Sequence, residues 1–363
     1  MRSEVLDLLK WKTAEFSPGR SRRTKNRLVS AQSLRRIISQ IAAFSAKTYG
    51  ESPTSLSALL SRQILTEYAQ WALNERRVQG RTVHTALGRL CAIKSYPPLA
   101  SHDFSWIPEL MTQLPIEDYA QIKERKERRR VPYDELARIP DQILREVATR
   151  ADLSPKRRSA MARDALLIRW FTVLPWRQRN VRECKVKPFS EGGNVWKEEV
   201  LPQMAKSLEV EKALKANPRQ RFWQFYFRPN ETKTSCTVRG LLPRQLVAPL
   251  EDYLENHRGV LFTGQPDPGT LFLGDWGHPL IQNDVSRLVG DITQRYAGRR
   301  VNPHLCRDIF ATQWVEEHPE SYLTLSKILW HKDPKTTIRI YGAGFDESHG
   351  ARSVEEWLDT RKK

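Results

Sequence analysis

Residues 302–312 read Asn-Pro-His-Leu-Cys-Arg-Asp-Ile-Phe-Ala-Thr, and Trp330-His331 and Tyr341 follow a short distance along the chain. This part of the sequence brings together two imidazoles, a guanidinium and a phenol. Breaking a phosphodiester without a metal ion requires a nucleophile, positive charge around the phosphorane and a proton donor for the leaving oxygen. Because these side chains supply such functions, the segment predicts phosphodiester chemistry.

The local sequence predicts that a helix presents the first of these groups. Asn302 is a good N-cap and Pro303 suits a first helical turn. His304 and Arg307 then lie three residues apart on one helical face. We expect both side chains to point into one site.

A second helix is predicted over residues 320–330, and it ends beside His331. At that C-terminus the helix dipole favours an imidazolium that donates a hydrogen bond to phosphate. Asp333 and Pro334 then begin a short helix that presents Tyr341. No tyrosine follows Tyr341, so this predicted nucleophile has no downstream competitor.

Pro303-His304, Arg307 and residues 310–312 match, in register, a pattern of the form Pro-His-x-Leu-Arg-His followed by Phe-Ala-Thr. In this the chain resembles the tyrosine recombinase (phage integrase) family. Asp308 departs from the pattern, because it places a carboxylate where the family often has His, and we expect it to temper the positive field or to orient Arg307. Trp330 replaces the Gly of the family's Leu-Gly-His. Tyr341 lies ten residues after His331, where the family usually has nine.

The family's first arginine lies in a stretch similar to Thr-Gly-Leu-Arg-x-x-Glu, and residues 174–181 occupy that place here. The resemblance selects Arg177, with Arg179 or Arg182 as alternatives. The family's hairpin lysine is matched by Lys233 in a Thr-Lys-Thr turn, between a strand-like segment, residues 221–227, and another at residues 237–243.

The resemblance implies a role for each matched residue. Tyr341 attacks the phosphate and forms a 3′-phosphotyrosyl link, His304 accepts the tyrosine proton, and Lys233 protonates the departing 5′ hydroxyl. Arg177, Arg307 and His331 stabilise the transition state. No metal or other cofactor is expected, because the bond energy is held in the covalent intermediate.

These implications favour a site-specific DNA recombinase or integrase, acting in integration, excision or transposition of a mobile element. One alternative is a type IB topoisomerase-like enzyme with the same chemistry and no sequence choice. The other is a catalytically inactive DNA-binding relative, suggested by the long His331–Tyr341 interval and by the replaced Gly and Glu.

Composition agrees with a nucleic-acid partner. The 363 residues include 60 Lys plus Arg against 42 Asp plus Glu, a formal net charge of +18. A chain this basic is most simply explained by a polyanionic partner, although a merely solvated basic surface remains open. The four cysteines lie far apart, which predicts neither a zinc site nor disulfides. The longest nearly apolar run, residues 165–176, is too short to cross a bilayer, so we expect a soluble cytoplasmic protein, nucleoid-associated if bacterial, with no membrane contact.

The length predicts at least two domains. We expect an N-terminal basic arm at 1–30, a helical core-binding domain at 31–115, a basic linker at 116–133 and a catalytic domain at 134–363. The resemblance implies that the first domain is all-α and SAM-like, that the catalytic domain is mixed α+β, and that the two form a C-shaped clamp on double-stranded DNA. It also implies a tetramer on two duplexes, with the terminal helix 353–362 docking in a neighbour, and possible accessory recombination proteins.

Basic residues on the polar faces of the predicted core-binding helices and in the linker are candidates for phosphate contacts. They are Arg35, Arg36, Arg76, Arg77, Arg81, Arg89, Lys94, Arg128, Arg129 and Arg130.

Overall fold

The computed structural model of the chain describes all residues except 19, 21–27, 201–207, 263, 265 and 342–363. The chain forms two compact units, Met1–Glu124 and Arg125–Lys363, which are described separately. Residues 19 and 21–27 of the expected N-terminal arm and the whole predicted helix 353–362 lie outside the described residues. No helix in the described part of the chain is long and apolar enough to cross a membrane.

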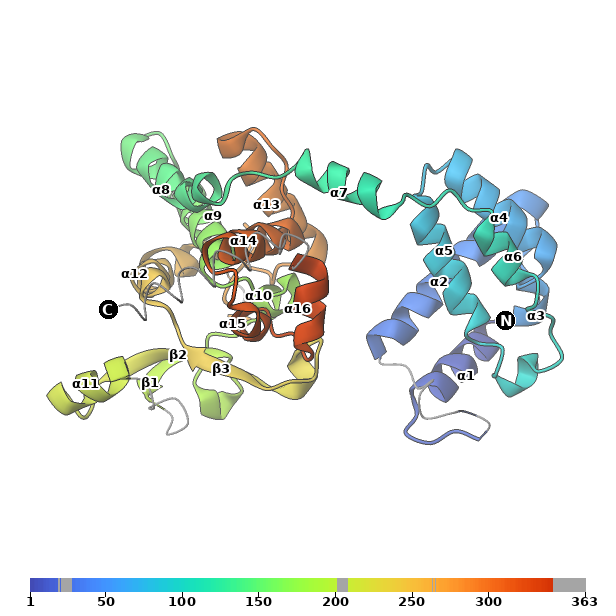
Figure 1. Cartoon of the computed structure of the whole chain (residues 1–363), viewed down its shortest axis with the longest axis horizontal. Coiled ribbons are helices and arrows are strands. Elements are labelled where there is room, and N and C mark those ends of the chain that lie inside the picture. The colour runs from blue at the N-terminus through green and yellow to red at the C-terminus, as the bar shows by residue number, and fades with distance from the viewer. Residues whose placement is uncertain (19, 21–27, 201–207, 263, 265, 342–363) are drawn as a thin grey trace, which may run out of the picture. The chain divides into compact units, whose positions relative to one another are not determined.

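All regular secondary structure among the described residues of the first unit is helical (Figure 1). Serine side chains begin two of its helices: Ser55 Oγ accepts from the Ala58 amide at 3.1 Å, and Ser61 Oγ from the Ile64 amide at 3.3 Å. The elements are α1 (Arg2–Thr13), α2 (Leu28–Tyr49), α3 (Leu56–Leu59), α4 (Arg62–Asn74), α5 (Gly80–Cys91), η2 (Pro97–Leu99) and α6 (Ile107–Thr112).

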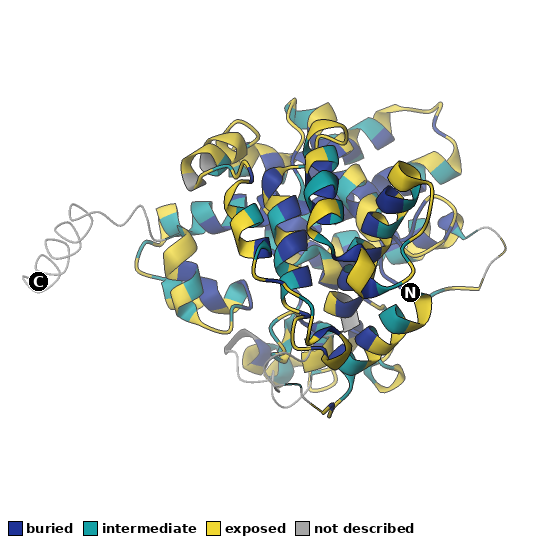
Figure 2. Ribbon diagram, turned by 90° about the vertical axis from the view of Figure 1, so that its right-hand side faces the viewer, coloured by how far each residue is buried: buried dark blue, intermediate teal, exposed yellow. Residues whose placement is uncertain are grey.

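Apolar residues on the helices of this unit form its core. Ile41 of α2, Leu65 of α4 and Leu87 of α5 are all fully buried in one cluster. Figure 2 shows the buried residues in dark blue along one side of such helices, with exposed residues on the other. Gly80 begins α5, where Pro115 O leaves no space for a Cβ atom.

The expected N-terminal arm is wrong for its first residues. Helix α1 packs on α2, and its Leu8 is fully buried in the same core. The Leu56 amide donates to Glu4 at 3.0 Å, which ties α1 to α3. The Arg20 guanidinium donates to the carbonyls of Lys12 and Ala14 and so satisfies groups at the end of α1.

Helix α7 (Tyr119–Glu127) contains the boundary between the units. The second unit combines helices with a small sheet. Its helices are α8 (Tyr133–Thr149), α9 (Pro155–Val173), α10 (Gln178–Arg182), α11 (Leu208–Ala216), α12 (Arg244–Asp252), α13 (Gln282–Ala297), α14 (Pro303–Glu317), α15 (Tyr322–Ile328) and α16 (Pro334–Tyr341). Short helical turns are η3 (Phe189–Glu191), η4 (Pro229–Glu231), the π-turn η5 (Tyr253–His257) and η6 (Arg258–Leu261).

The sheet has the order β1 (Val195–Glu199), β2 (Arg221–Phe227) and β3 (Val238–Leu241), with both pairings antiparallel. Strands β2 and β3 confirm the predicted hairpin. Gly240 pairs with Phe225, and a Cβ at Gly240 would lie 2.8 Å from the phenyl ring, so the close packing of this ring requires glycine.

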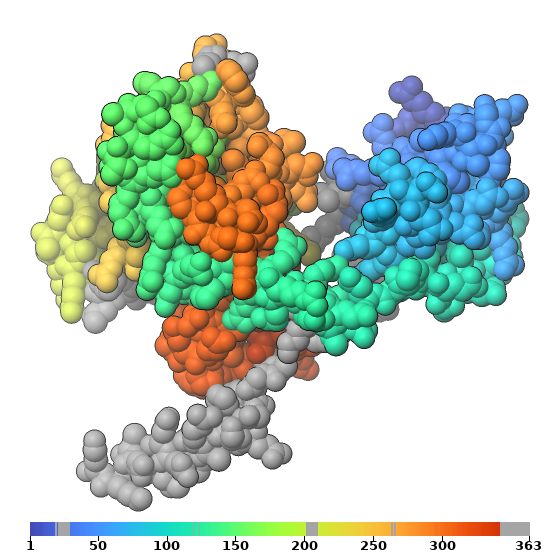
Figure 3. Space-filling view, turned by 90° about the horizontal axis from the view of Figure 1, so that it is seen from above, coloured from blue at the N-terminus to red at the C-terminus, as the bar shows by residue number. Residues whose placement is uncertain are grey.

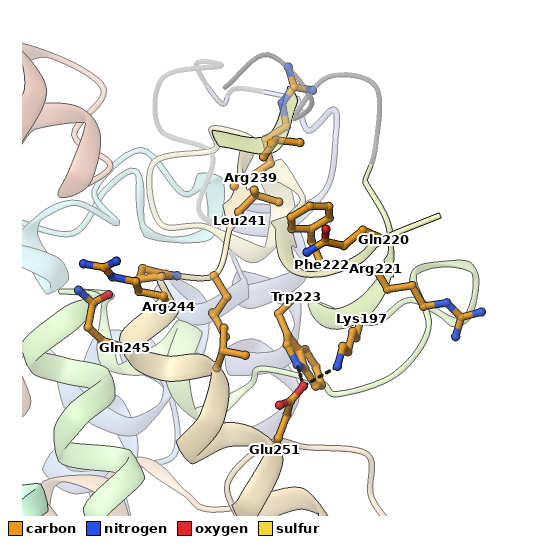
Figure 4. A pocket seen from close by; sticks show the side chains of 15 residues that line it. Lys197, Gln220, Arg221, Phe222, Trp223, Arg239, Leu241, Arg244, Gln245 and Glu251 are labelled. Carbon is orange, nitrogen blue, oxygen red and sulfur yellow. Dashed lines mark hydrogen bonds and ion pairs between the residues drawn. The ribbon is translucent and has the colours of Figure 1, made fainter. Parts of the chain in front are cut away.

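Beside the sheet, a hollow of about 930 Å³ lies between β2, β3 and α12. Figure 4 shows Lys197 and the Trp223 indole converging on Glu251 in this hollow, with hydrogen bonds of 2.6 and 2.9 Å. Its rim carries Arg221, Arg239 and Arg244, and none of the predicted catalytic residues line it.

Helix α9 is the centre of the second unit's core. It is buried along most of its length, and its Trp170 packs edge-to-face on Trp176 and Phe272. Helices α8 and α13, green and orange in Figure 3, are joined by Glu146, which accepts from Arg295 at 2.6 Å and from the Tyr296 hydroxyl at 2.5 Å. The core positions α10 and α14, which carry the two predicted active-site arginines.

Candidate active site

Helix α14 begins as the sequence predicted. Asn302 Oδ1 accepts the Leu305 amide at 2.8 Å, and Pro303 occupies the first turn. The two side chains expected to share a face differ sharply in burial: Arg307 is 4% exposed, whereas His304 is 78% exposed. Arg307 therefore lies inside the unit and His304 at its surface.

Arg307 is held by main-chain carbonyls. Its Nη1 donates to Pro175 O and its Nη2 to Leu329 O, which connects α14 to the segment before α10 and to the end of α15. Nη2 also lies 3.3 Å from His331 Nε2. Among the described residues no carboxylate forms an ion pair with Arg307. Burial, and then the charge of Arg177, lower the pKa of Arg307 to about 10.

Arg177 is the second guanidinium of the site and stands at the N-cap of α10. Its Nη1 is buried and has no hydrogen-bond partner among the described residues. Burial lowers its pKa, and Cys236 and Tyr341 are near enough to oppose that shift. The alternatives Arg179 and Arg182 both pair with Glu183, so Arg177 remains the arginine without a carboxylate.

His331 contradicts the expectation of an imidazolium. Its Nε2 faces the donor Arg307 Nη2, and its Nδ1 lies 2.8 Å from Thr337 Oγ1. Because a guanidinium cannot accept a hydrogen bond, Nε2 is the acceptor and the proton resides on Nδ1. Burial, followed by the charges of Arg307 and Arg177, lowers the His331 pKa to about 4. These three effects outweigh the helix dipole.

Trp330 replaces the family's glycine at a left-handed backbone position, φ 53°. Its ring is 7% exposed and packs on Trp176 and Phe227 at centroid distances of 5.4 and 5.5 Å. This packing offsets the conformational cost of a side chain at positive φ. The indole thus joins the end of α15 to the sheet.

Helices α14, α15 and α16 lie together (Figure 1), and α16 brings Tyr341 back to α14. The ring packs on a small cluster that includes Ala311, Leu325 and Leu329. The Tyr341 hydroxyl donates to Asp308 Oδ1 at 3.0 Å. Arg307 and Arg177 are close enough to act on its pKa, which burial and then Asp308 raise well above the ordinary value.

Asp308 does not orient Arg307 through an ion pair, as the sequence suggested. Besides Tyr341 it contacts an ammonium group and an imidazole: Lys126 Nζ lies 2.9 Å from Oδ2, and His304 Nδ1 lies 3.5 Å from Oδ1. The Asp308 side chain is 15% exposed. His304 and the phenol therefore meet at the same oxygen of this carboxylate.

Lys233 lies in the loop that joins β2 to β3, and it is exposed. Asn180, at the place of the family's acidic residue, donates from Nδ2 to Glu231 O at 3.1 Å and so fastens the start of this loop to α10. Cys236, near the other end of the loop, is close enough to Arg177 to influence its pKa. The loop thus lies beside Arg177.

In the first unit, the seven predicted DNA-binding residues are all exposed. Three of them, Arg76, Arg81 and Arg89, line a groove of about 720 Å³ between α2, α4 and α5, together with Lys47. Among the residues that line this groove none is acidic. The arrangement favours a polyanionic ligand.

The predicted linker arginines behave differently. Arg129 donates to Arg300 O from both Nε and Nη2, at 3.1 and 3.0 Å, and Arg130 lies 3.6 Å from Glu316. Both are occupied within the second unit. Arg128 is exposed.

Four residues of the site were not predicted as such from the sequence. Lys126 and Asp308 meet from positions 182 residues apart, a pairing that no local pattern encodes. Thr337, fully buried, fixes the His331 ring, and Asn180 fixes the hairpin loop. The sequence marked Asp308 only as a departure from the family's pattern, and it gave no signal for the contacts of Lys126.

Comparisons with solved structures found site-specific recombinases and a transposon integrase. XerH bound to palindromic difH in a post-cleavage complex is 16% identical, with coverage of 98% of this chain and 95% of that chain and a TM-score of 0.47. The Tn1549 transposon integrase in complex with transposon right end DNA is 13% identical, with coverage of 98% and 99% and a TM-score of 0.49.

No protein-family model matches the chain. The tyrosine recombinase XerC from two strains of Lactobacillus delbrueckii subsp. bulgaricus is 32% identical over 90 residues. The match covers 24% of this chain and 30% of each relative, so the chain matches less than a third of these proteins' length. Over these 90 residues the chain is therefore similar to part of a tyrosine recombinase.

Proposed function

We propose that this chain is a site-specific DNA recombinase that cuts and rejoins DNA through a covalent 3′-phosphotyrosyl intermediate. The observation that carries the proposal is a pair of desolvated guanidiniums, Arg177 and Arg307, beside the hydroxyl-bearing Tyr341. Neither forms an ion pair with a carboxylate among the described residues. Buried positive charge without a counter-ion is costly, and a bound phosphate would relieve that cost.

In the proposed reaction the scissile phosphate binds between Arg177 and Arg307, which donate to its non-bridging oxygens. His331 donates from its ring after the phosphate replaces Arg307 as its neighbour, because an anion stabilises the imidazolium. These three groups neutralise the charge that develops on the phosphorane. Such stabilisation is strongest in a site that excludes water.

Tyr341 attacks phosphorus and its oxygen forms the new O–P bond, while the bond from phosphorus to the 5′ oxygen breaks. His304 is the final acceptor of the tyrosine proton, and Lys233 supplies a proton to the 5′ oxygen. The exposed β2–β3 loop gives Lys233 access to DNA, and Asn180 holds that loop against α10. The reverse sequence rejoins the strand.

The partner in this proposal is double-stranded DNA, bound by exposed basic residues of the first unit and by the second unit's site, as the two jaws of a clamp. Four protomers on two duplexes would carry out strand exchange, in the integration, excision or transposition of a mobile element. The acid-free groove at Arg76, Arg81 and Arg89 supports a phosphate-binding role for the first unit.

The test is recovery of the covalent adduct. Cells expressing the chain are lysed in SDS, protein-bound DNA is collected, and the sequence joined to the protein is read. We expect adducts at one recurrent site, and none with Tyr341→Phe; Tyr322→Phe, also in the region of α15 and α16, is the matched control. Adducts that persist in Tyr341→Phe would show that Tyr341 is not the nucleophile. Adducts at scattered sites would favour a topoisomerase. DNA binding without any adduct would favour an inactive relative.

A further inference from the structure

Asp308 lies at the meeting point of three helices and touches the reacting atom of the proposed chemistry. It comes from α14, receives the Tyr341 hydroxyl from α16 and pairs with Lys126 of α7. The roles assigned above do not use it, and the family often has a histidine at its place. A carboxylate so largely buried requires an explanation.

The two carboxylate oxygens have separate partners. Oδ2 is engaged by Lys126 Nζ at 2.9 Å. Oδ1 faces both the phenol, at 3.0 Å, and His304 Nδ1, at 3.5 Å. One oxygen atom is therefore shared by the proton donor and by the imidazole expected to accept the proton.

His304 by itself is poorly placed to take the proton. Its side chain is 78% exposed and its Nδ1 points at Asp308, one helical turn further along α14. The Tyr341 hydroxyl points at the same carboxylate and makes no contact with the imidazole among the described residues. Geometry comes first in assigning a general base, and here it selects the carboxylate.

Resting on the proposed function, we propose that Asp308 is the catalytic residue that receives the Tyr341 proton and relays it to His304. As the tyrosine oxygen bonds to phosphorus, its O–H bond breaks and the proton passes to Asp308 Oδ1. Asp308 then returns to its ionised form by passing the proton to His304 Nδ1, and the exposed ring releases it to water. Lys126 holds the second oxygen and so fixes the orientation of the carboxylate.

The surrounding charges suit this role. Burial and then Asp308 raise the pKa of Tyr341, whereas Arg307 and Arg177 lower it. The phenol therefore keeps its proton in the free protein, and it needs an acceptor at the moment of attack. The charged and titratable groups that face this pair are Lys126 from α7, His304 and Arg307 from α14, and Arg177 from the start of α10.

The experiment is single-turnover cleavage of a nicked duplex that carries the sequence recovered from the covalent adducts, with full-length protein. Asp308→Asn retains an oxygen that accepts the phenol's hydrogen bond but cannot take its proton. We expect cleavage to slow by about 10²- to 10⁴-fold. Asp308→Glu restores a carboxylate and should recover part of the rate, and the acid limb of the wild-type pH–rate profile should be absent in Asp308→Asn.

A second substrate separates proton removal from proton donation. In a duplex with a bridging 5′ sulfur at the scissile bond, the leaving group needs no proton. This substrate should rescue Lys233→Ala and leave Asp308→Asn slow. Two results would overturn the relay. One is that the sulfur substrate rescues Asp308→Asn as fully as Lys233→Ala. The other is that Asp308→Asn cleaves the ordinary duplex at or above the wild-type rate, which would show that Asp308 holds the tyrosine back.

A further measurement is made on the folded protein without DNA and follows the pKa of Tyr341. Spectroscopic titration, with Tyr341→Phe used to assign the signal, should show a lower Tyr341 pKa in Asp308→Asn than in wild type, and an unchanged value would count against the contact. If wild type forms no adduct, the proposed function itself has failed. If wild type forms the adduct and Asp308→Asn cleaves at the same rate as wild type, only the relay fails.

Discussion

Trp330 has a backbone conformation that glycine adopts without strain, and its indole fills the space between Trp176 and Phe227. The two effects oppose each other in any substitution. Removing a buried tryptophan costs about 3–5 kcal/mol, and a side chain at positive φ costs roughly 1–2 kcal/mol relative to glycine. Position 330 is therefore suited to a test of strain against packing.

We predict that Trp330→Ala loses about 3–5 kcal/mol of unfolding free energy and that Trp330→Gly loses about 1 kcal/mol less. Urea denaturation measures both. The neighbouring Leu329 has φ −80° and is the matched control, since there Ala should be more stable than Gly. The same order at both positions would contradict the strain at Trp330.

The pKa of His331 has a consequence for stability. It is about 4 in the folded protein, below the ordinary 6.5, so the unfolded chain binds more protons between these values. The contribution of the neutral ring is fully present above pH 6.5 and is lost as pH falls towards 4. We expect His331→Gln to flatten the fall in unfolding free energy over this window.

Chemical denaturation at pH 7, 6, 5 and 4 measures this effect, with His278→Gln, at a half-exposed ring remote in sequence, as the control for loss of a histidine. An unchanged slope in His331→Gln would show that the buried, neutral ring is not the source of the pH dependence.

The sequence predicted which residue types would gather around a phosphate, because Arg307, His331 and Tyr341 follow caps and helix ends that are visible in the chain. It did not predict what each would touch. The neutrality of His331 depends on burial and on Arg177, which lies more than a hundred residues away. The carboxylate at position 308 was recognised only as a departure, since its partners Lys126 and Tyr341 come from other helices.

At the scale of elements, α14 supplies three site residues, so the start of this helix matters for all of them. Asn302 satisfies the Leu305 amide at 2.8 Å. We predict that Asn302→Ala lowers the unfolding free energy by about 1 kcal/mol, whereas Asn302→Asp, which retains an accepting oxygen, changes it little. Thermal and urea unfolding of the DNA-free protein measure the difference. Equal losses in both variants would show that the cap is not the stabilising contact.

Strong periodicity and clear caps explain which elements were predictable. The helical character of residues 31–115 and the Asn-Pro start of α14 were predicted, as was the strand-like segment that forms β2. Helices α12 and α13 and strand β1 were not predicted. The burial pattern of β1, two buried residues followed by exposed ones, lacks the alternation that marks a strand. Its form depends on pairing with β2, a contact between distant parts of the chain.

At the scale of the whole molecule, the net charge of +18 can act as a general attraction or through particular phosphate contacts. The groove in the first unit distinguishes these cases, because Arg76, Arg81 and Arg89 line it and Arg2, Lys10 and Arg62 do not. Replacing either set by glutamine removes the same charge. Only the first set removes residues that would neutralise phosphates at the groove.

We therefore predict that the Arg76, Arg81 and Arg89 triple Gln variant binds duplex DNA more weakly and with a shallower dependence on salt. Each lost phosphate contact should reduce the slope of log K against log salt by about 0.9, or roughly 2–3 for the three together. The Arg2, Lys10 and Arg62 variant should retain nearly the full slope. Titrations at several salt concentrations measure both. Similar slopes for the two variants would mean that DNA responds to the overall charge of the chain, and the groove would then have no special part in binding.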